Sequence, residues 1–392
     1  MPTPEPMEVD VAIVGGGIAG PAMACALAPT GWRVLLAERS AEPLDTARGD
    51  HLQPHTCEWL DEWGVLDDMW SRGAEKRLGA RYLLANGEDV LSVPSEHLDI
   101  PHPYFLYLNH ELIGESLLAG AARNPNFERW QPAVAQPAPV ADGCDLMVEH
   151  AGAQTRVRAK LVVAADGRVS RFRRAMDIGA TSYAYKNPLL TYFAERTMDD
   201  PRNEVRAYFS TAGIISVVPR VRGGWKIGLP VPPGEVAKWK RATPDEVAAR
   251  FAKLLPDIAG VQPEYVGVYP VTSTNAERWS EANVVLLGDA CNTLHPGRSQ
   301  GMNVAMRAAH RLVQLLVAGD AMTSRKALRD TLEAYEAEVK PPMDARLADN
   351  HHRGLEMDRL DADETDRMRA GLAAVAADPA LHQKYCIASA GY

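Results

Sequence analysis

The chain has 392 residues, a formal net charge of -9, 46% hydrophobic residues and five cysteines. This length can bury a sizeable core, in one large domain or two intertwined ones. The acidic balance argues against a nucleic-acid partner, since phosphate binding needs concentrated Lys and Arg. No run reaches the roughly 18 apolar residues of a membrane span. The cysteines contain no CxxC pair, which argues for reduced thiols and against structural zinc.

The first unit, residues 9–39, has the pattern of a strand, a glycine turn, a helix and a second strand. Gly15, Gly17 and Gly20 have GxGxxG spacing, which allows a tight turn, a backbone approach to pyrophosphate and close helix packing. Glu38 ends the second strand, 18 residues after Gly20, where its carboxylate can accept from ribose hydroxyls. The alternative is a glycine-rich turn that binds no ligand. The strand before the glycines, the helix after them and the acidic residue at the end of the next strand together favour a dinucleotide site. The acid favours FAD or NAD over NADP.

The next stretch indicates a loop, then helices up to about residue 70, and a hairpin over 77–93 turning at Asn86-Gly87. His51 and His55 are four apart, but Pro54 between them and the lack of a carboxylate partner argue against a metal site. A helix is expected over 111–123, and Asp142-Gly143 marks another hairpin turn.

Two further apolar strands end in acidic turns. The strand over 160–165 ends in Asp166-Gly167, and the strand over 283–287 ends in Gly288-Asp289. Between them, residues 183–269 alternate like an antiparallel sheet, with one helix over 243–255. After the third strand, helices are expected over 304–318 and 325–339, and Pro341-Pro342 is expected to end them. The tail is helical in pattern and charged.

Three motifs, each following a strand, carry a family resemblance. They are GGGIAG with Glu38, AADGRVSRFRR over 164–174, and LLGDACNTLHPGRSQGMN over 286–303. Together they closely resemble the single-component flavin monooxygenases typified by p-hydroxybenzoate hydroxylase, a family that includes ubiquinone-precursor and quinolone hydroxylases. The resemblance covers most of residues 7–340.

The resemblance implies an α/β fold with a Rossmann-type FAD-binding domain, an inserted, mostly antiparallel β-sheet substrate domain and C-terminal helices. The FAD-binding domain would comprise 7–76, 100–180 and 271–340, the substrate domain 77–99 and 181–270, and the helical tail 341–392. The residues assigned to FAD are Gly15, Gly17, Ile18, Ala19, Gly20, Glu38, Arg39, Arg48, His110, Val134, Asp166, Gly167, Asp289, Gly301, Met302 and Asn303.

Several of these carry specific expectations. Asp289 would accept from the ribityl chain, and residues 301–303 would lie at the pyrimidine edge of the flavin ring, where amides and the helix dipole favour negative charge. Arg48 would reach over the flavin, and Asp166-Gly167 would contact FAD and the nicotinamide nucleotide. Each has a structural alternative: Asp289 could cap a helix, Arg48 could be a solvated loop residue, and Asp166-Gly167 could form a turn that contacts no ligand. His110 stands where the family usually has an arginine, which weakens or replaces one cofactor contact.

The implied activity is that of an FAD-dependent monooxygenase. It would use NADH or NADPH and dioxygen to hydroxylate or epoxidise an aromatic or polycyclic small molecule through a flavin C4a-hydroperoxide. His295, Pro296 and Arg298, in the loop before the flavin-facing turn, are the candidate catalytic residues, and His295 could accept a phenolic proton. The alternative for His295 is a surface loop residue with no role.

The substrate should lie between the inserted sheet and the flavin. The sheet residues considered for its wall are Tyr208, Ile215, Val217, Trp225 and Ile227, although alternation turns half of the apolar side chains of a sheet elsewhere.

Other readings stay open. A reductase or dehydrogenase of the geranylgeranyl-reductase type shares the cofactor domain, and a non-catalytic flavin-binding protein could retain the fold. The N-terminal residues hold prolines and acids instead of an export signal, so we expect a cytoplasmic protein, as a monomer or homodimer.

Overall fold

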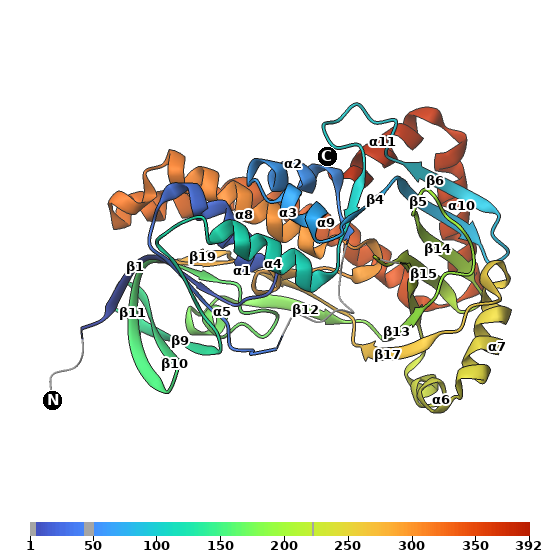
Figure 1. The fold of residues 1–392 in the computed structure, drawn as a ribbon, viewed down its shortest axis with the longest axis horizontal. Helices are drawn as coiled ribbons and strands as arrows, with labels where there is room; N and C mark the ends of the chain where they lie inside the picture. The colour runs from blue at the N-terminus through green and yellow to red at the C-terminus, as the bar shows by residue number, and fades with distance from the viewer. Residues whose placement is uncertain (1–4, 43–50, 222) are drawn as a thin grey trace.

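The computed structural model describes residues 5–42, 51–221 and 223–392. Figure 1 shows two lobes joined by long helices. One holds the first strands of the chain, and the other holds the sheet formed by its middle part. Among the described residues no helix has the length and apolar character needed to cross a membrane. The cytoplasmic location stays a prediction.

A central sheet with the order β19-β20-β11-β1-β2-β8 organises the first lobe. Strand β1 pairs in parallel with β2 and β11, while β2 pairs in parallel with β8 and β11 with β20. The side chains of Val11, Ala12 and Ile13 are fully buried, as expected for a strand covered on both faces. The strands are β1 (Met7–Val14), β2 (Val34–Ala37), β8 (Phe127–Trp130), β11 (Ala153–Ala164), β19 (Ser280–Glu281) and β20 (Val284–Leu286). The predicted parallel strands are thus confirmed.

Helix α1 (Ala19–Leu27) packs against α4 (His110–Ala121) and against α8 (Gly301–Ala318) in this lobe. The smaller helices are α2 (Pro54–Glu62), α3 (Leu66–Ser71) and α5 (Arg171–Ala175). Strands β9 (Ala133–Val140) and β10 (Gly143–His150) form the hairpin predicted at Asp142-Gly143. Two three-stranded sheets complete the lobe: β3 (His51–Leu52), β7 (Phe105–Tyr107) and β4 (Glu75–Arg77); and β12 (Ala180–Ala184), β18 (Thr272–Ala276) and β21 (Asn292–Thr293).

The second lobe is a seven-stranded sheet with the order β17-β13-β16-β15-β14-β5-β6. Its strands are β5 (Gly79–Leu84), β6 (Asp89–Pro94), β13 (Leu189–Ala194), β14 (Val205–Ser210), β15 (Gly213–Pro219), β16 (Trp225–Pro230) and β17 (Glu264–Tyr269). The predicted β5–β6 hairpin is confirmed, and it joins this sheet through the parallel pairing of β5 with β14. All other pairs in the sheet are antiparallel.

Two helices, α6 (Val236–Arg241) and α7 (Pro244–Leu254), cover one face of this sheet, where the sequence predicted one. Thr243 and Glu246 form a reciprocal capping box at the start of α7. This arrangement satisfies backbone donors that would otherwise lack partners in the first turn.

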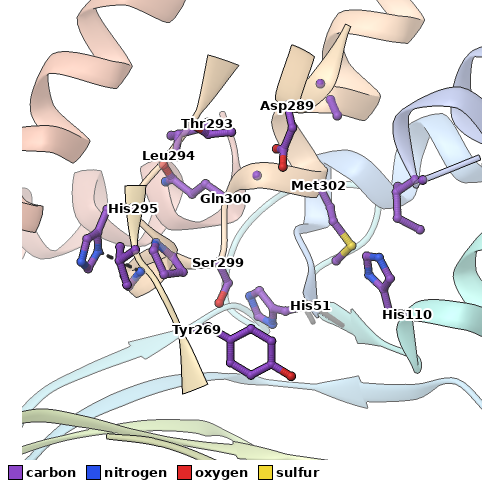
Figure 2. Close-up of a pocket in the computed structure, with 18 of the residues that line it drawn as sticks. His51, His110, Tyr269, Asp289, Thr293, Leu294, His295, Ser299, Gln300 and Met302 are labelled. Carbon is purple, nitrogen blue, oxygen red and sulfur yellow. Dashed lines mark hydrogen bonds between the residues drawn. The ribbon is translucent and has the colours of Figure 1, made fainter. Parts of the chain in front are cut away.

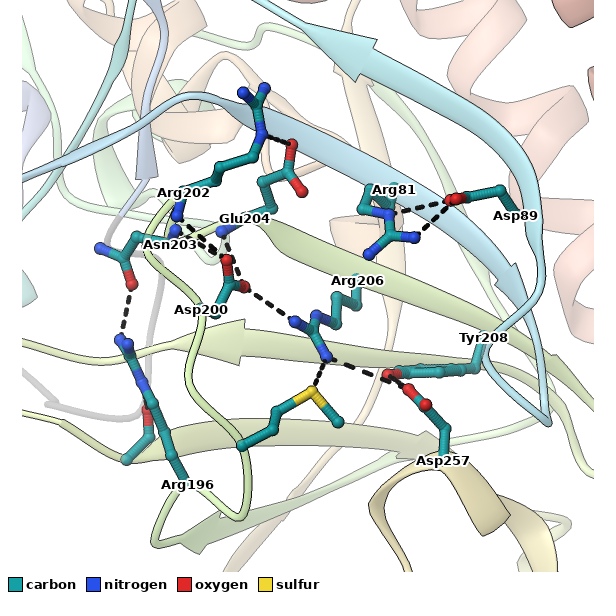
Figure 3. A network of polar contacts seen from close by, with 12 residues as sticks. Arg81, Asp89, Arg196, Asp200, Arg202, Asn203, Glu204, Arg206, Tyr208 and Asp257 are labelled. Carbon is teal, nitrogen blue, oxygen red and sulfur yellow. Dashed lines mark hydrogen bonds and ion pairs between the residues drawn. The ribbon is translucent and has the colours of Figure 1, made fainter.

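A buried polar network before β14 holds the junction with β5 (Figure 3). The Asp200 carboxylate accepts hydrogen bonds from the backbone N–H groups of Arg202, Asn203 and Glu204 at 3.1–3.2 Å and from the Arg206 guanidinium at 3.0 Å. Both members of the Asp200–Arg206 pair have side chains only 6% exposed. The network therefore fixes the turn that leads the chain into β14.

The C-terminal part forms α9 (Arg325–Arg359), α10 (Ala362–Ala377) and α11 (Pro379–Ala390). The expectation that Pro341-Pro342 ends a helix is wrong, because α9 continues through both residues. Both prolines are exposed, so the carbonyls that lose their donors can be solvated, while buried Tyr335 and Met343 anchor the helix on either side. The domain division stays a prediction, with its boundary at 340/341 inside α9.

Candidate functional site

A cavity of about 2080 Å³ lies between the central sheet and the seven-stranded sheet. Its wall includes the glycine turn after β1, the segments after β11 and β20, the start of α8 and one face of the second sheet. Drug-sized ligands occupy pockets of roughly 300 to 1,000 Å³. This cavity therefore has room for a dinucleotide and a second molecule.

The glycine turn is built by close backbone approaches. A Cβ at Gly15, whose φ is +112°, would lie 2.2 Å from the Ala165 carbonyl oxygen, and one at Gly20 would lie 1.9 Å from the Gly15 oxygen. These two glycines are therefore required by packing. A Cβ at Gly17, by contrast, would meet no described atom within 4 Å, and Gly17 lines the cavity.

Helix α1 starts at Ala19 beside this open space. Its N-cap residue Ile18 provides no side-chain hydrogen bond, so no side chain at that position caps the first-turn amides. Uncapped amides and the positive end of the helix dipole form an anion site. Glu38 closes the other side of the turn, where its carboxylate accepts from the backbone N–H of Gly16 and from that of Ser40, the latter at 2.6 Å.

Asp166 follows β11 at the next strand end. One of its carboxylate oxygens accepts from the Arg171 backbone N–H at 2.7 Å, which ties it to the start of α5. The other oxygen, Oδ1, is buried and receives no hydrogen bond from any residue that the structure describes. A buried acceptor of this kind on a cavity wall suits a ligand hydroxyl.

Asp289 follows β20 at the third strand end. It lies in a 3-10 turn (Gly288–Ala290) and lines the cavity, so it does not cap an α-helix. A Cβ at Gly288 would lie 2.7 Å from the Ala19 Cβ, which shows how closely this loop presses on the start of α1. The three motifs therefore converge on one end of the cavity, and the glycine cradle and the unpartnered Asp166 oxygen fit the phosphates and hydroxyls of FAD.

The structure places most of the sequence-predicted cofactor residues on this wall. The lining includes Gly15, Gly17, Ile18, Ala19, Glu38, Arg39, His110, Val134, Asp166, Gly167, Asp289, Gly301 and Met302. Gly20 and Asn303 lie behind it. Arg48 falls outside the described residues. Figure 2 shows His110, Asp289 and Met302 facing a common space.

The Asn303 side chain braces the start of α8. Its Oδ1 accepts from the Gln53 backbone N–H and the Thr56 hydroxyl, each at 2.8 Å, and its Nδ2 donates to the carbonyls of His51 and Ser299, each at 3.1 Å. Three of these bonds join the start of α8 to residues 51–56, and the fourth ties it to the turn directly before the helix. Asn303 thus fixes the position of the turn that the sequence predicts to face the flavin.

His295 and Pro296 line the cavity, while the side chain of Arg298 lies outside what the structure describes. Burial is the main cause that lowers the pKa of His295 to about 4. Its Nδ1 accepts from the Gly297 backbone N–H at 3.2 Å, and its ring lies edge-on to Tyr185. The ring proton is then on Nε2, so this geometry favours a hydrogen-bond donor over the predicted base.

The sheet residues considered for the substrate wall are on the wrong face. Tyr208, Ile215, Val217, Trp225 and Ile227 are at most 1% exposed and pack beneath α6 and α7. The cavity receives the alternating residues, among them Ala207, Ile214, Ser216, Val218, Lys226 and Gly228. Helices α6 and α7 cover the more apolar face, because burial removes its apolar side chains from water, and the mixed face lines the cavity. The apolar face of α7 was the signal in the sequence that could have indicated which face of the sheet is buried.

The C-terminal helices also contribute to the cavity, which sequence reasoning missed. His352, Arg359 and Arg367 line it from α9 and α10, and Tyr385 lines it from α11. No local pattern in the tail indicated this, because the contact depends on how α9 crosses the molecule. Among the described residues, no group of three or more His, Cys, Asp or Glu side chains could hold a metal ion.

Comparisons with known proteins agree with this geometry. A family model described as an FAD binding domain matches residues 8–349, and the chain belongs to the FAD-dependent aromatic monooxygenase family. It is similar to a ubiquinone hydroxylase of Rhodospirillum rubrum, at 28% identity over 85% of this chain and 78% of that protein.

It is also similar to a 12-dehydrotetracycline 5-monooxygenase/anhydrotetracycline 6-monooxygenase of Streptomyces rimosus, at 29% identity over 86% of this chain and 67% of that protein. A solved p-nitrophenol 4-monooxygenase from Pseudomonas putida has the same fold, with a TM-score of 0.84, 21% identity and coverage of 97% of each chain. The protein is accordingly an FAD-dependent monooxygenase.

Proposed function

We propose that this enzyme uses NADH or NADPH and dioxygen to hydroxylate an aromatic or polycyclic small molecule held between the cofactor and the seven-stranded sheet. The observation that carries the proposal is one continuous cavity, which runs from the glycine turn to the mixed face of that sheet. Its size accommodates cofactor and substrate together. Relatives named for ubiquinone and for tetracycline-type compounds support an aromatic substrate of this range.

The residues that would hold FAD follow from the three strand ends. Backbone amides near Gly17 and Ala19 would bind the pyrophosphate, Glu38 the adenosine ribose, and Asp166 and Asp289 hydroxyl groups farther along. Bound FAD would supply the electron chemistry that dioxygen activation requires. The chain itself would position the cofactor and the substrate, exclude water from the space between them and provide hydrogen bonds.

The wall facing the ligand combines apolar and polar groups. Ala207, Ile214 and Val218 give it apolar surface, which would exclude water and contact an aromatic ring. Ser216 and Lys226 add polar groups on the same face, and His295 adds one from the loop after β21. Such a surface positions a ring that bears polar substituents.

The test is to load the purified protein with FAD and to measure NADH and NADPH oxidation with and without a panel of aromatic compounds. The panel contains 4-nitrophenol, 4-hydroxybenzoate and anhydrotetracycline. We expect at least one of them to accelerate oxidation of the reductant and to yield a product that contains one atom from ¹⁸O-labelled dioxygen. Hydrogen peroxide without labelled product would refute the proposal for that panel.

The other readings predict different results. A reductase would reduce an acceptor without incorporating oxygen, and a flavin-binding protein without activity would retain FAD but show no substrate-stimulated oxidation. The labelled product distinguishes all three.

A further inference from the structure

His51 is held on the cavity wall by contacts on several sides. Its carbonyl oxygen accepts from Asn303 Nδ2 at 3.1 Å, and its ring stacks on Phe105 with centroids 4.7 Å apart and an interplanar angle of 21°. In the view of Figure 2 the imidazole is drawn above the Tyr269 ring and beside Ser299, and all three residues line the cavity. The orientation of the ring is therefore set before any ligand binds.

Arg77 determines which ring nitrogen carries the proton. This arginine is fully buried, its guanidinium lies 3.9 Å from the centre of the Tyr107 ring, and it donates to the Pro219 carbonyl. A second guanidinium nitrogen lies 3.2 Å from His51 Nδ1. Since arginine only donates, Nδ1 must accept, and the proton of the neutral ring is on Nε2.

The electrostatic surroundings of His51 are positive. The pKa of His51 is lowered to about 3, mainly by burial and in smaller part by the positive charges of Arg77 and Lys226. Both of these neighbours are cations. Lys226 comes from β16 and lines the same cavity from the seven-stranded sheet. A neutral N–H donor in a positive field suits an anionic oxygen.

We propose that His51 and Lys226 form the subsite that binds an oxyanion of the substrate, a phenolate or carboxylate oxygen of an acidic aromatic compound. His51 would donate from Nε2, Lys226 would supply the charge from β16 of the seven-stranded sheet, and Arg77 would act as a positioning residue. The inference rests on the proposed function for the identity of the ligand as substrate, but its binding test does not require turnover.

The experiment is calorimetric titration of FAD-loaded protein with paired probes. The anions are benzoate and 4-nitrophenol at a pH where it is ionised, and the neutral counterparts are benzamide and nitrobenzene. We expect at least one anion to bind more tightly than its counterpart. The pair that shows this preference distinguishes a carboxylate from a phenolate.

Two variants remove the donor and the charge separately. His51→Phe keeps a ring to stack on Phe105, and Lys226→Met keeps the stem without the charge. Each should weaken binding of the preferred anion about 10- to 100-fold, the size of one lost hydrogen bond to a charged group, and change the neutral probe less than about twofold. His51→Gln, which can place an amide N–H near the Nε2 position, should recover part of the affinity.

Lys253→Met is the matched control, because Lys253 is exposed on α7 and lies outside the cavity lining. It should leave anion binding unchanged. The proposal is overturned if neither anion is preferred, or if Lys226→Met binds anions as wild type does. Loss of FAD by His51→Phe while Lys226→Met keeps full anion affinity would assign His51 to the cofactor and also overturn it.

The two proposals fail in different ways. Preferential anion binding without oxygenation of any aromatic compound would refute the proposed reaction and leave the subsite standing. Oxygenation of an aromatic compound with no preference for anions would refute the subsite and leave the proposed reaction standing.

Discussion

Gly17→Ala should lower the affinity of the protein for FAD without lowering the stability of the apoprotein. A Cβ at Gly17 would meet no described atom within 4 Å, so the apoprotein should accept alanine without strain. Replacing glycine at a compatible position should stabilise by about 0.4 to 1 kcal/mol, because the unfolded chain loses freedom. The same methyl would point into the space that we assign to the pyrophosphate.

The expected effect on FAD follows from the hydrogen bonds that would be displaced. Each bond from a backbone N–H to a charged phosphate oxygen contributes about 1.5 to 3 kcal/mol, so loss of one should weaken FAD binding about 10- to 150-fold. Gly15→Ala gives the contrasting result. Its φ of +112° and the 2.2 Å approach to the Ala165 oxygen should destabilise the apoprotein by at least about 1 to 3 kcal/mol.

Two measurements on each variant decide the matter: urea unfolding of the apoprotein, and quenching of FAD fluorescence on titration with it. The reasoning holds if Gly17→Ala loses FAD affinity with normal stability and Gly15→Ala loses stability first. A Gly17→Ala protein that binds FAD as tightly as wild type would show that the open space beside α1 is not the pyrophosphate site.

Three further predictions follow from burial and charge. Arg206→Leu breaks a buried ion pair and should lower the free energy of unfolding, measured in urea titrations, by about 3 kcal/mol. Arg325→Ala removes one partner of an ion pair whose side chains are both 72% exposed, so it should lower the free energy of unfolding by less than about 1 kcal/mol. Equal effects of the two substitutions would contradict this account. The pKa values of His51 and His295 fall from 6.5 in the unfolded chain to about 3 and about 4 in the folded protein. Below pH 6.5 the unfolded chain therefore binds more protons, and the stability of the folded protein should fall as the pH drops. The urea midpoint of His51→Phe should fall less steeply with decreasing pH than that of wild type, and an equally steep fall would contradict this prediction. His295→Ala should lower turnover about tenfold, the size of one lost hydrogen bond, with little loss of FAD, and unchanged coupled oxygenation at every pH tested would remove His295 from the mechanism.

The cofactor half of the site was predictable because its signals are local. An apolar run followed by glycines or by an acidic turn indicates the end of a buried parallel strand, and Gly15, Glu38, Asp166 and Asp289 were found in this way. All four line the cavity where the strands converge. Parallel strands bring their carboxyl ends to one edge, so local patterns sufficed to bring these residues together.

The substrate half was not predictable to the same degree. Alternation identified the strands of the second sheet but not which face the helices would cover, and it selected Tyr208 and Trp225 from the buried face. The passage of α9 through Pro341-Pro342 depends on the solvent exposure of those prolines, which the sequence does not state. The tail therefore reached the cavity without any local signal.

His51 illustrates the division. In the sequence it was half of a rejected metal pair, because a histidine pattern does not reveal what lies beside the ring. Its role depends on Arg77, Phe105 and Lys226, which come from three other strands, and on burial that keeps the imidazole neutral. Glycine spacing and strand patterns, which are short-range properties of the chain, therefore determined the cofactor cradle. The pairing of sheets and the crossing of helices, which depend on contacts between distant segments, decided the chemistry of the substrate wall.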